Sequence, residues 1–241
     1  YEISLGLVGS EMCIRDRGAN VLQQLYNWVD AFIVGHVEGQ LAMGSVGATT
    51  TSVNLFVTVI TGFTLGLNVL MAQRHGAGET HKVAKTLSLF ALILGGAFLV
   101  IAVPGYFFAG ELLVLLDTTQ DMLPLSTQYL SVIFLGMPFL AVYNTYSAAL
   151  RALGDSRAPF LSVLVSSLVN IALDILLVAI IPWGVRGAAI ATVFSQAAMT
   201  VFIIAYAAKM HPELRFVRPV KADLPLLKEG IALFFYTDDS R

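Results

Sequence analysis

The sequence predicts an all-α, polytopic membrane protein, and three observations support this fold class. Of the 241 residues, 57% are hydrophobic and only 12% are charged, whereas soluble proteins average about 25% charged residues. The mean hydropathy is +0.78. The charged residues gather in short stretches between long uncharged runs, several of which reach the roughly 20 apolar residues that a membrane helix needs. The net charge of −2 argues against a nucleic-acid-binding protein.

Residues 1–17 differ in character from the rest of the chain. They are polar and irregular, and residues 7–17 resemble a translated sequencing-library adapter. We expect this stretch to be an artefact, which must be set aside before the fold is interpreted. On this interpretation the true N-terminus is missing and Cys13 has no functional weight. The alternative is a genuine N-terminal tail.

Six apolar runs follow, each long enough to cross a bilayer. Charged residues lie inside only two of them, Asp30 in the first and Asp174 in the fifth. We expect the spans within residues 18–35, 41–73, 86–110, 122–150, 159–182 and 187–208.

The basic residues lie on alternate loops. Ten lysines and arginines fall between spans two and three, between spans four and five, or after span six, whereas Arg186 alone falls on the opposite side. Because cytoplasmic loops carry an excess of basic residues, we expect these three regions and the N-terminus to be cytoplasmic, in a bacterial or archaeal plasma membrane. The loops at 36–41, 109–123 and 182–186 should then face outward.

Residues 211–229 have a different composition, with three prolines and mixed charge. We interpret them as a cytoplasmic linker between two halves of a larger protein, the alternative being a terminal tail. Apolar residues resume near residue 230, which predicts the truncated start of a second lobe. The polar ending at 234–241 does not fit a normal span and is a second candidate for an assembly error.

Asp30 and Asp174 are the most informative residues in the sequence. An aspartate at the centre of a membrane helix costs about 2.5–3.5 kcal/mol on insertion scales, and the spans contain no lysine or arginine to neutralise it. Each carboxyl group must therefore be protonated, face water or bind a cation from solution, with Na⁺ as the metal ion we consider. The alternative is that each caps a re-entrant bend or lies near the membrane surface.

Other polar residues are weaker candidates for a site. Asn170 lies four residues before Asp174 and shares its helix face. Threonines and asparagines between residues 49 and 68 could line a hydrated cleft, or could pack against neighbouring helices together with Gly62 and Gly66. Trp28 could shape a cavity or anchor the chain at the interface.

The histidines do not predict catalysis or metal binding. His36, His75, His81 and His211 all lie at span ends or in loops, and their spacing fits neither a metal site nor a catalytic triad. We therefore expect no enzyme and no cofactor.

Three passages together resemble the multidrug and toxic compound extrusion (MATE) family. The first is Gln23-Gln24-Leu25-Tyr26-Asn27-Trp28-Val29-Asp30, followed by Ile33-Val34-Gly35. The second is Gly136-Met137-Pro138-Phe139, continuing to Leu153-Gly154-Asp155-Ser156-Arg157-Ala158-Pro159. The third is Asn170-Ile171-Ala172-Leu173-Asp174, followed by Gly187-Ala188-Ala189.

The resemblance implies the N-terminal six-helix lobe of a twelve-helix, two-lobe antiporter. Such proteins export cationic or amphipathic drugs in exchange for H⁺ or Na⁺, and this one would work as a monomer of the two-lobe chain. By position, the cation-coupling residues would be Asp30, Asp174, Asn170, Tyr129 and Thr192. Candidates for the substrate cleft are Gln24, Asn27, Trp28 and Asn54.

The expected mechanism is alternating access, in which neutralising the two aspartates lets the first helix repack and weakens drug binding.

Two other function classes are possible. A lipid-linked oligosaccharide flippase would need basic residues in its lumen, because its cargo carries a pyrophosphate. A seven-helix receptor or scaffold would need an extracellular N-terminus.

Overall fold

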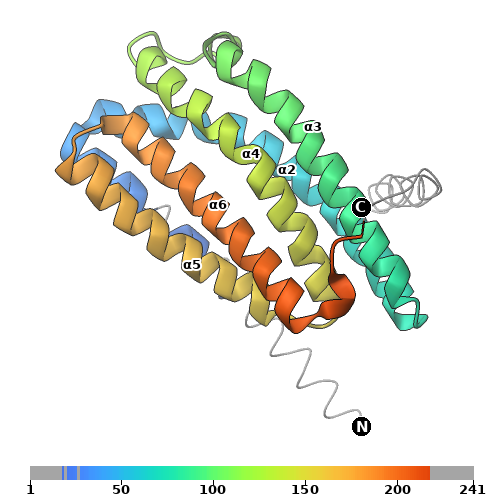
Figure 1. Cartoon of the computed structure of the whole chain (residues 1–241). Helices are drawn as coiled ribbons and strands as arrows, with labels where there is room; N and C mark the ends of the chain where they lie inside the picture. The colour runs from blue at the N-terminus through green and yellow to red at the C-terminus, as the bar shows by residue number, and fades with distance from the viewer. Residues whose placement is uncertain (1–17, 19–20, 26–27, 218–241) are drawn as a thin grey trace.

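The computed structural model describes residue 18, residues 21–25 and residues 28–217. Its described part is helical apart from short turns, and Figure 1 shows the long helices packed side by side in a bundle. The helices are α2 (Gln40–Gly76), α3 (Thr80–Leu115), α4 (Leu123–Ala152), α5 (Arg157–Asp174), a π-helix η1 (Ile175–Ile180), α6 (Gly184–Met210) and a 3₁₀ turn η2 (Pro212–Leu214).

The first predicted span is represented by helical residues 21–25 and 28–38. Gly39 alone separates this segment from α2 and has a φ of 90°. A side chain would be strained at that angle, so glycine permits the sharp reversal. The expected loop at 36–41 is therefore reduced to one non-helical residue.

The turn between α4 and α5 is also short. Gly154, between α4 and α5, has a φ of 83°, and the Asp155 side chain accepts hydrogen bonds from the N–H groups of Arg157 and Ala158 at 2.9 and 3.3 Å. These two bonds satisfy N–H groups of the first turn of α5 that have no partner within the helix. The local sequence thus ends one helix and starts the next within four residues.

Helix α4 lies at the centre of the packing and contacts α2, α3 and α6. Hydrogen bonds join it to α2 and α6, from Ser126 to the Ser45 carbonyl of α2 at 2.9 Å and from Thr200 of α6 to the Phe139 carbonyl at 2.8 Å. Small residues allow α3 to approach closely, because a Cβ at Gly105 would lie 2.6 Å from the Phe134 ring. Small residues and hydrogen bonds from serine and threonine hydroxyl groups commonly join helices inside a membrane.

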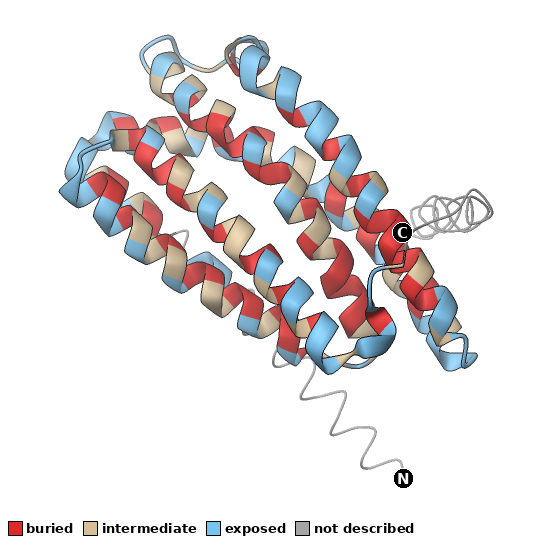
Figure 2. Ribbon diagram, viewed as in Figure 1, coloured by how far each residue is buried: buried red, intermediate tan, exposed pale blue. Residues whose placement is uncertain are grey.

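The outer faces of the bundle are apolar. Figure 2 shows buried residues along the facing sides of the helices and exposed ones outside, and the exposed side chains include Val100, Phe107, Phe194 and Val201. Five helices of the described residues are long and apolar enough to cross a membrane. The predicted all-α, polytopic membrane fold is confirmed.

The helices run beyond the apolar stretches that predicted them. For example, α3 extends from Thr80 to Leu115 rather than over residues 86–110, because a helix continues past the hydrocarbon layer where its backbone bonds remain satisfied. The predictions for residues 1–17 and 230–241 lie outside the described residues, as does the linker beyond residue 217.

Candidate functional site

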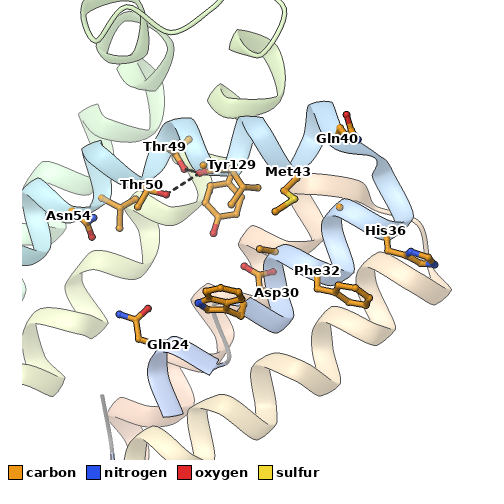
Figure 3. A pocket seen from close by; sticks show the side chains of 16 residues that line it. Gln24, Asp30, Phe32, His36, Gln40, Met43, Thr49, Thr50, Asn54 and Tyr129 are labelled. Atoms are coloured by element: carbon orange, nitrogen blue, oxygen red, sulfur yellow. Dashed lines mark hydrogen bonds between the residues drawn. The ribbon is translucent and has the colours of Figure 1, made fainter. Parts of the chain in front are cut away.

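A pocket of about 880 Å³ opens between the N-terminal helical segment and α2 (Figure 3). One wall comes from residues 24–36, the opposite wall from residues 40–54 of α2, and Tyr129 of α4 contributes from the side. The pocket is therefore built by segments that the chain reversal at Gly39 brings face to face. A volume of this size suits a drug-sized molecule.

An aromatic strip forms part of the first wall. Trp28, Phe32 and His36 follow one another at four-residue spacing, so they share one helix face. The rings of Phe32 and His36 are stacked, with centroids 5.8 Å apart and an interplanar angle of 8°. Trp28 and Phe32 are 77% and 70% exposed. The strip is thus a flat, accessible surface on which a planar ligand can stack.

The α2 wall is mixed. Met43 and Val53 provide apolar surface, whereas Thr49, Thr50 and Asn54 are polar. The hydroxyl groups of Thr49 and Thr50 both donate to the Val46 carbonyl, at 2.7 and 3.4 Å. Both hydroxyl protons are therefore used within α2, and each oxygen keeps lone pairs that can accept a hydrogen bond.

Among the described residues that line this pocket, Asp30 is the one acidic residue, and none is a lysine or arginine. Figure 3 shows its carboxyl group directed into the space between the two walls. The side chain is only 7% exposed, and Oδ1 has no hydrogen-bond partner among the described residues. Burying an ionised carboxylate without a partner is costly, so this group requires a proton or a cation.

Asp174 and Asn170 lie deeper, on α5. Both are fully buried, and the oxygen and nitrogen atoms of both side chains lack a hydrogen-bond partner within the described residues. The Asp174 carboxyl group is near enough to that of Asp30 for the two charges to repel each other when both are ionised. Asp174 also ends the α-helical part of α5, where the chain enters the π-helix η1, and π-helical turns are frequent at functional sites.

This arrangement can take up a small cation or a proton. Two carboxyl groups and an amide offer oxygen ligands, the type that hard cations prefer, and each has unused bonding capacity. Within the described residues no group of three or more His, Cys, Asp or Glu side chains could hold a metal ion.

Comparison with known proteins identifies the family. A family model described as MatE matches residues 18–176, which include the pocket, both aspartates and Asn170. The chain belongs to the MATE family.

Curated relatives of this MATE chain are bacterial. The chain is 31% identical over 194 residues to the probable multidrug resistance protein YpnP of Bacillus subtilis, covering 79% of this chain and 43% of that protein. It is 30% identical over 187 residues to the probable multidrug resistance protein NorM of Thermotoga maritima, covering 74% and 39%. The chain thus spans less than half the length of these relatives, as expected for the N-terminal half.

Solved structures show the same fold. An outward-facing multidrug resistance MATE transporter of the MOP superfamily superposes with a TM-score of 0.82 at 20% identity, covering 95% of this chain and 52% of that one. A crystal structure of a MATE protein in complex with MaD3S gives a TM-score of 0.79 at 23% identity, again covering 95% and 52%. At these identities the likeness concerns the fold.

The structure separates the sequence-predicted site residues into two groups. Gln24, Trp28, Asp30, Asn54 and Tyr129 all line the pocket. Asn170 and Asp174 are buried in α5. Thr192 is half-buried on α6 and donates its hydroxyl proton to the Ala188 carbonyl at 3.0 Å, and Asn27 lies outside the described residues.

Other pocket residues escaped the sequence analysis. Phe32, His36 and Met43 looked like ordinary membrane-helix or interface residues, yet all three line the cavity. The four-residue spacing that joins Phe32 and His36 to Trp28 is the signal that could have found them. Gln196 was also missed; its buried Oε1 has no partner among the described residues, and it lies against Gly136 of α4.

Proposed function

We propose that this chain forms the N-terminal lobe of a twelve-helix antiporter, which exports cationic or amphipathic drugs in exchange for H⁺ or Na⁺. The observation that carries the proposal is the pair of buried carboxyl groups, Asp30 and Asp174. Both have oxygens without a hydrogen-bond partner among the described residues, and the sequence places no basic residue inside the spans. Such groups are functional by default in a membrane protein, because an idle charge would be too costly. The names of the relatives, which are multidrug resistance proteins, support the export of drugs.

The aromatic strip and Asp30 together suit an organic cation. A cation over an aromatic face gains about 0.5–2 kcal/mol, and a carboxylate supplies the opposite charge. None of the described residues that line the pocket is a lysine or arginine, which favours a cationic cargo over the pyrophosphate of a lipid-linked oligosaccharide.

The coupling follows from competition for the same negative charge. With both carboxyl groups ionised, the lobe attracts a cationic drug. When a proton or Na⁺ enters from outside, it neutralises them, the N-terminal helical segment can repack against α2, and the drug is released. The coupling cation can bias this two-state equilibrium only because it binds the two states unequally.

Replacing Asp174 by Asn in the full-length transporter tests the proposal. We expect D174N to lower gradient-driven export of a cationic dye from everted vesicles at least 100-fold, because an amide cannot alternate between a charged and a neutral form. Membrane insertion should be unchanged, as measured by the amount of protein in washed membranes.

Asp117→Asn is the matched control. It makes the same chemical change at an exposed residue of the α3–α4 turn, where the φ of 60° also suits asparagine. D117N should export the dye at the wild-type rate. Unimpaired, gradient-dependent export by D174N would disprove the coupling role.

A further inference from the structure

The chain that follows α6 folds back onto the bundle. After α6 ends at Met210, the turn η2 places Leu214 in contact with the bundle at 1% exposure, and η2 packs against α3 and α6. The backbone N–H of Val217 donates to the Ser88 hydroxyl of α3 at 2.9 Å. Residues 211–217, which we call the docked segment, are therefore fixed at the end of the bundle that carries most of the basic residues.

His211 holds the start of the docked segment through both nitrogens of its ring. Nε2 lies 3.0 Å from Asp155 Oδ2, in the α4–α5 turn, and Nδ1 lies 3.2 Å from Glu213 Oε1. The side chains of His211 and Asp155 are only 19% and 15% exposed. Asp155 uses its other oxygen, Oδ1, to accept the N–H groups that start α5, so its carboxylate joins α5 to the docked segment.

Only a protonated ring satisfies both contacts. A neutral imidazole has one N–H donor and one lone pair, whereas the imidazolium ion has two donors. If His211 were neutral, one ring nitrogen would present its lone pair to a carboxylate. Docking and protonation of His211 are consequently linked.

We propose that His211 is a pH-sensitive latch, whose imidazolium bridges Asp155 and Glu213 to hold the docked segment and which releases that segment as the pH on its side of the membrane rises. Because the positive-inside pattern predicts this side to be cytoplasmic, the latch would respond to cytoplasmic pH. The proposal concerns how the chain leaves this lobe after α6 and does not depend on which substrate is transported.

Both carboxylates of the latch remain charged near neutral pH. Burial raises the pKa of Asp155, but hydrogen bonds from His211, the Arg157 and Ala158 N–H groups and Tyr206 outweigh this effect and hold the pKa below its ordinary value of 3.8. The pKa of Glu213 is also lowered, mainly by its own backbone N–H and despite partial burial, with His211 and His75 contributing. The two carboxylates therefore keep their charge, and loss of the His211 ring proton is the change that opens the latch.

The other ionisable groups around the latch come from several elements. Tyr206 of α6 bonds to Asp155, Arg157 of α5 lies near Tyr206, and His75 of α2 lies near Glu213. Arg157 is a permanent cation and Tyr206 does not ionise near neutral pH in water. His75 is a second histidine close to Glu213, so its variant His75→Gln is needed as a control.

The test measures whether a buried position of the docked segment becomes accessible with pH. In a full-length protein from which every native cysteine has been removed, Leu214→Cys is labelled with a maleimide in inside-out vesicles at pH 6 and pH 8.5. Its rate is divided by that of Ala77→Cys, an exposed residue of the α2–α3 turn, which removes the pH dependence of the thiol itself. We expect the normalised rate to rise roughly tenfold, which corresponds to the loss of one charged hydrogen bond.

Two replacements of His211 separate charge from shape. His211→Gln should label quickly at both pH values, whereas His211→Arg, with its permanent charge, should label slowly at both. His75→Gln should keep the wild-type response. Hydrogen exchange of residues 211–217 in the unsubstituted protein, corrected for the intrinsic effect of pH, repeats the test without a cysteine. The proposal would be overturned if the normalised labelling rate and the protection from hydrogen exchange were both the same at pH 6 and pH 8.5. It would also be overturned if residues 211–217 were fully protected in His211→Gln.

Discussion

At the residue scale, the two tryptophans of the chain have different surroundings. Trp28 lines the pocket as the first member of the aromatic strip, whereas Trp183 is an exposed residue of the η1–α6 connection and does not line it. Sequence alone left Trp28 open between interface anchor and cavity wall, because both roles need an aromatic residue near a span end. The chain reversal at Gly39 turns the helix face that carries Trp28 toward α2, and this makes Trp28 part of the pocket wall.

We predict that Trp28→Ala raises the KM for a cationic dye roughly fivefold to tenfold while leaving kcat nearly unchanged. The reason is that stacking on the ring contributes binding energy in the ground state and the transition state alike. Initial export rates across a range of dye concentrations measure both constants. Trp183→Ala is the matched control and should leave both unchanged; equal effects of the two substitutions would refute a specific role for Trp28.

The buried carboxyl groups show what a sequence can and cannot predict at this scale. Asp30 and Asp174 stood out because a charge within an apolar run is rare and expensive. Their burial and their unpaired oxygens depend on the packing of α5 against α6 and of the N-terminal segment against α2, which no periodicity encodes. The same holds for His211, whose partner Asp155 is 56 residues away in the chain.

At the element scale, the helices were predictable and their close contacts were not. Long apolar runs locate the spans, but helix ends depend on turn geometry, so α3 proved longer than its apolar core. Gly105 and Gly96 look equivalent in the sequence of α3. In the structure, a Cβ at Gly105 would meet the Phe134 ring of α4, whereas a Cβ at Gly96 would meet nothing within 4 Å.

We therefore predict that Gly105→Ala destabilises the fold by about 1–3 kcal/mol, the usual cost of overpacking a tight contact. The Phe134 ring must shift, since it is buried at 2% exposure. The midpoint of thermal unfolding in detergent, followed by size-exclusion chromatography, measures the effect. Gly96→Ala should unfold at or slightly above the wild-type temperature, because alanine favours a helix over glycine. The explanation fails if Gly105→Ala is as stable as Gly96→Ala.

At the scale of the whole molecule, the antiparallel helices place the turns α2–α3 and α4–α5 and the end of α6 at one end of the bundle (Figure 1). These are the regions with Arg74, Lys82, Arg151, Arg157 and Lys209. The fold thus gathers on one side the basic residues that the sequence places on alternate loops. This agreement motivates the proposed orientation, with that end in the cytoplasm.

Labelling of single cysteines tests the orientation. In a full-length protein from which every native cysteine has been removed, a membrane-impermeant maleimide applied to intact cells should label Asp117→Cys, in the α3–α4 turn, within minutes. Ala77→Cys, in the α2–α3 turn, should react only in inside-out vesicles. Both positions are exposed, so accessibility of the thiol is not limiting. The reverse pattern would contradict the proposed topology.

The central claim is that a drug and a coupling cation compete for the charge of Asp30 and Asp174. The most direct measurement is cation release upon drug binding, by the purified full-length transporter in weakly buffered detergent solution, followed with a pH indicator and a Na⁺ electrode. We predict that a cationic drug releases H⁺ or Na⁺ from the wild-type protein and that D174N abolishes most of this release. Because coupling is reciprocal, a bound cation should weaken drug binding by the same factor by which the bound drug weakens cation binding. Drug binding that releases neither cation, with an affinity independent of both pH and Na⁺, would contradict the account.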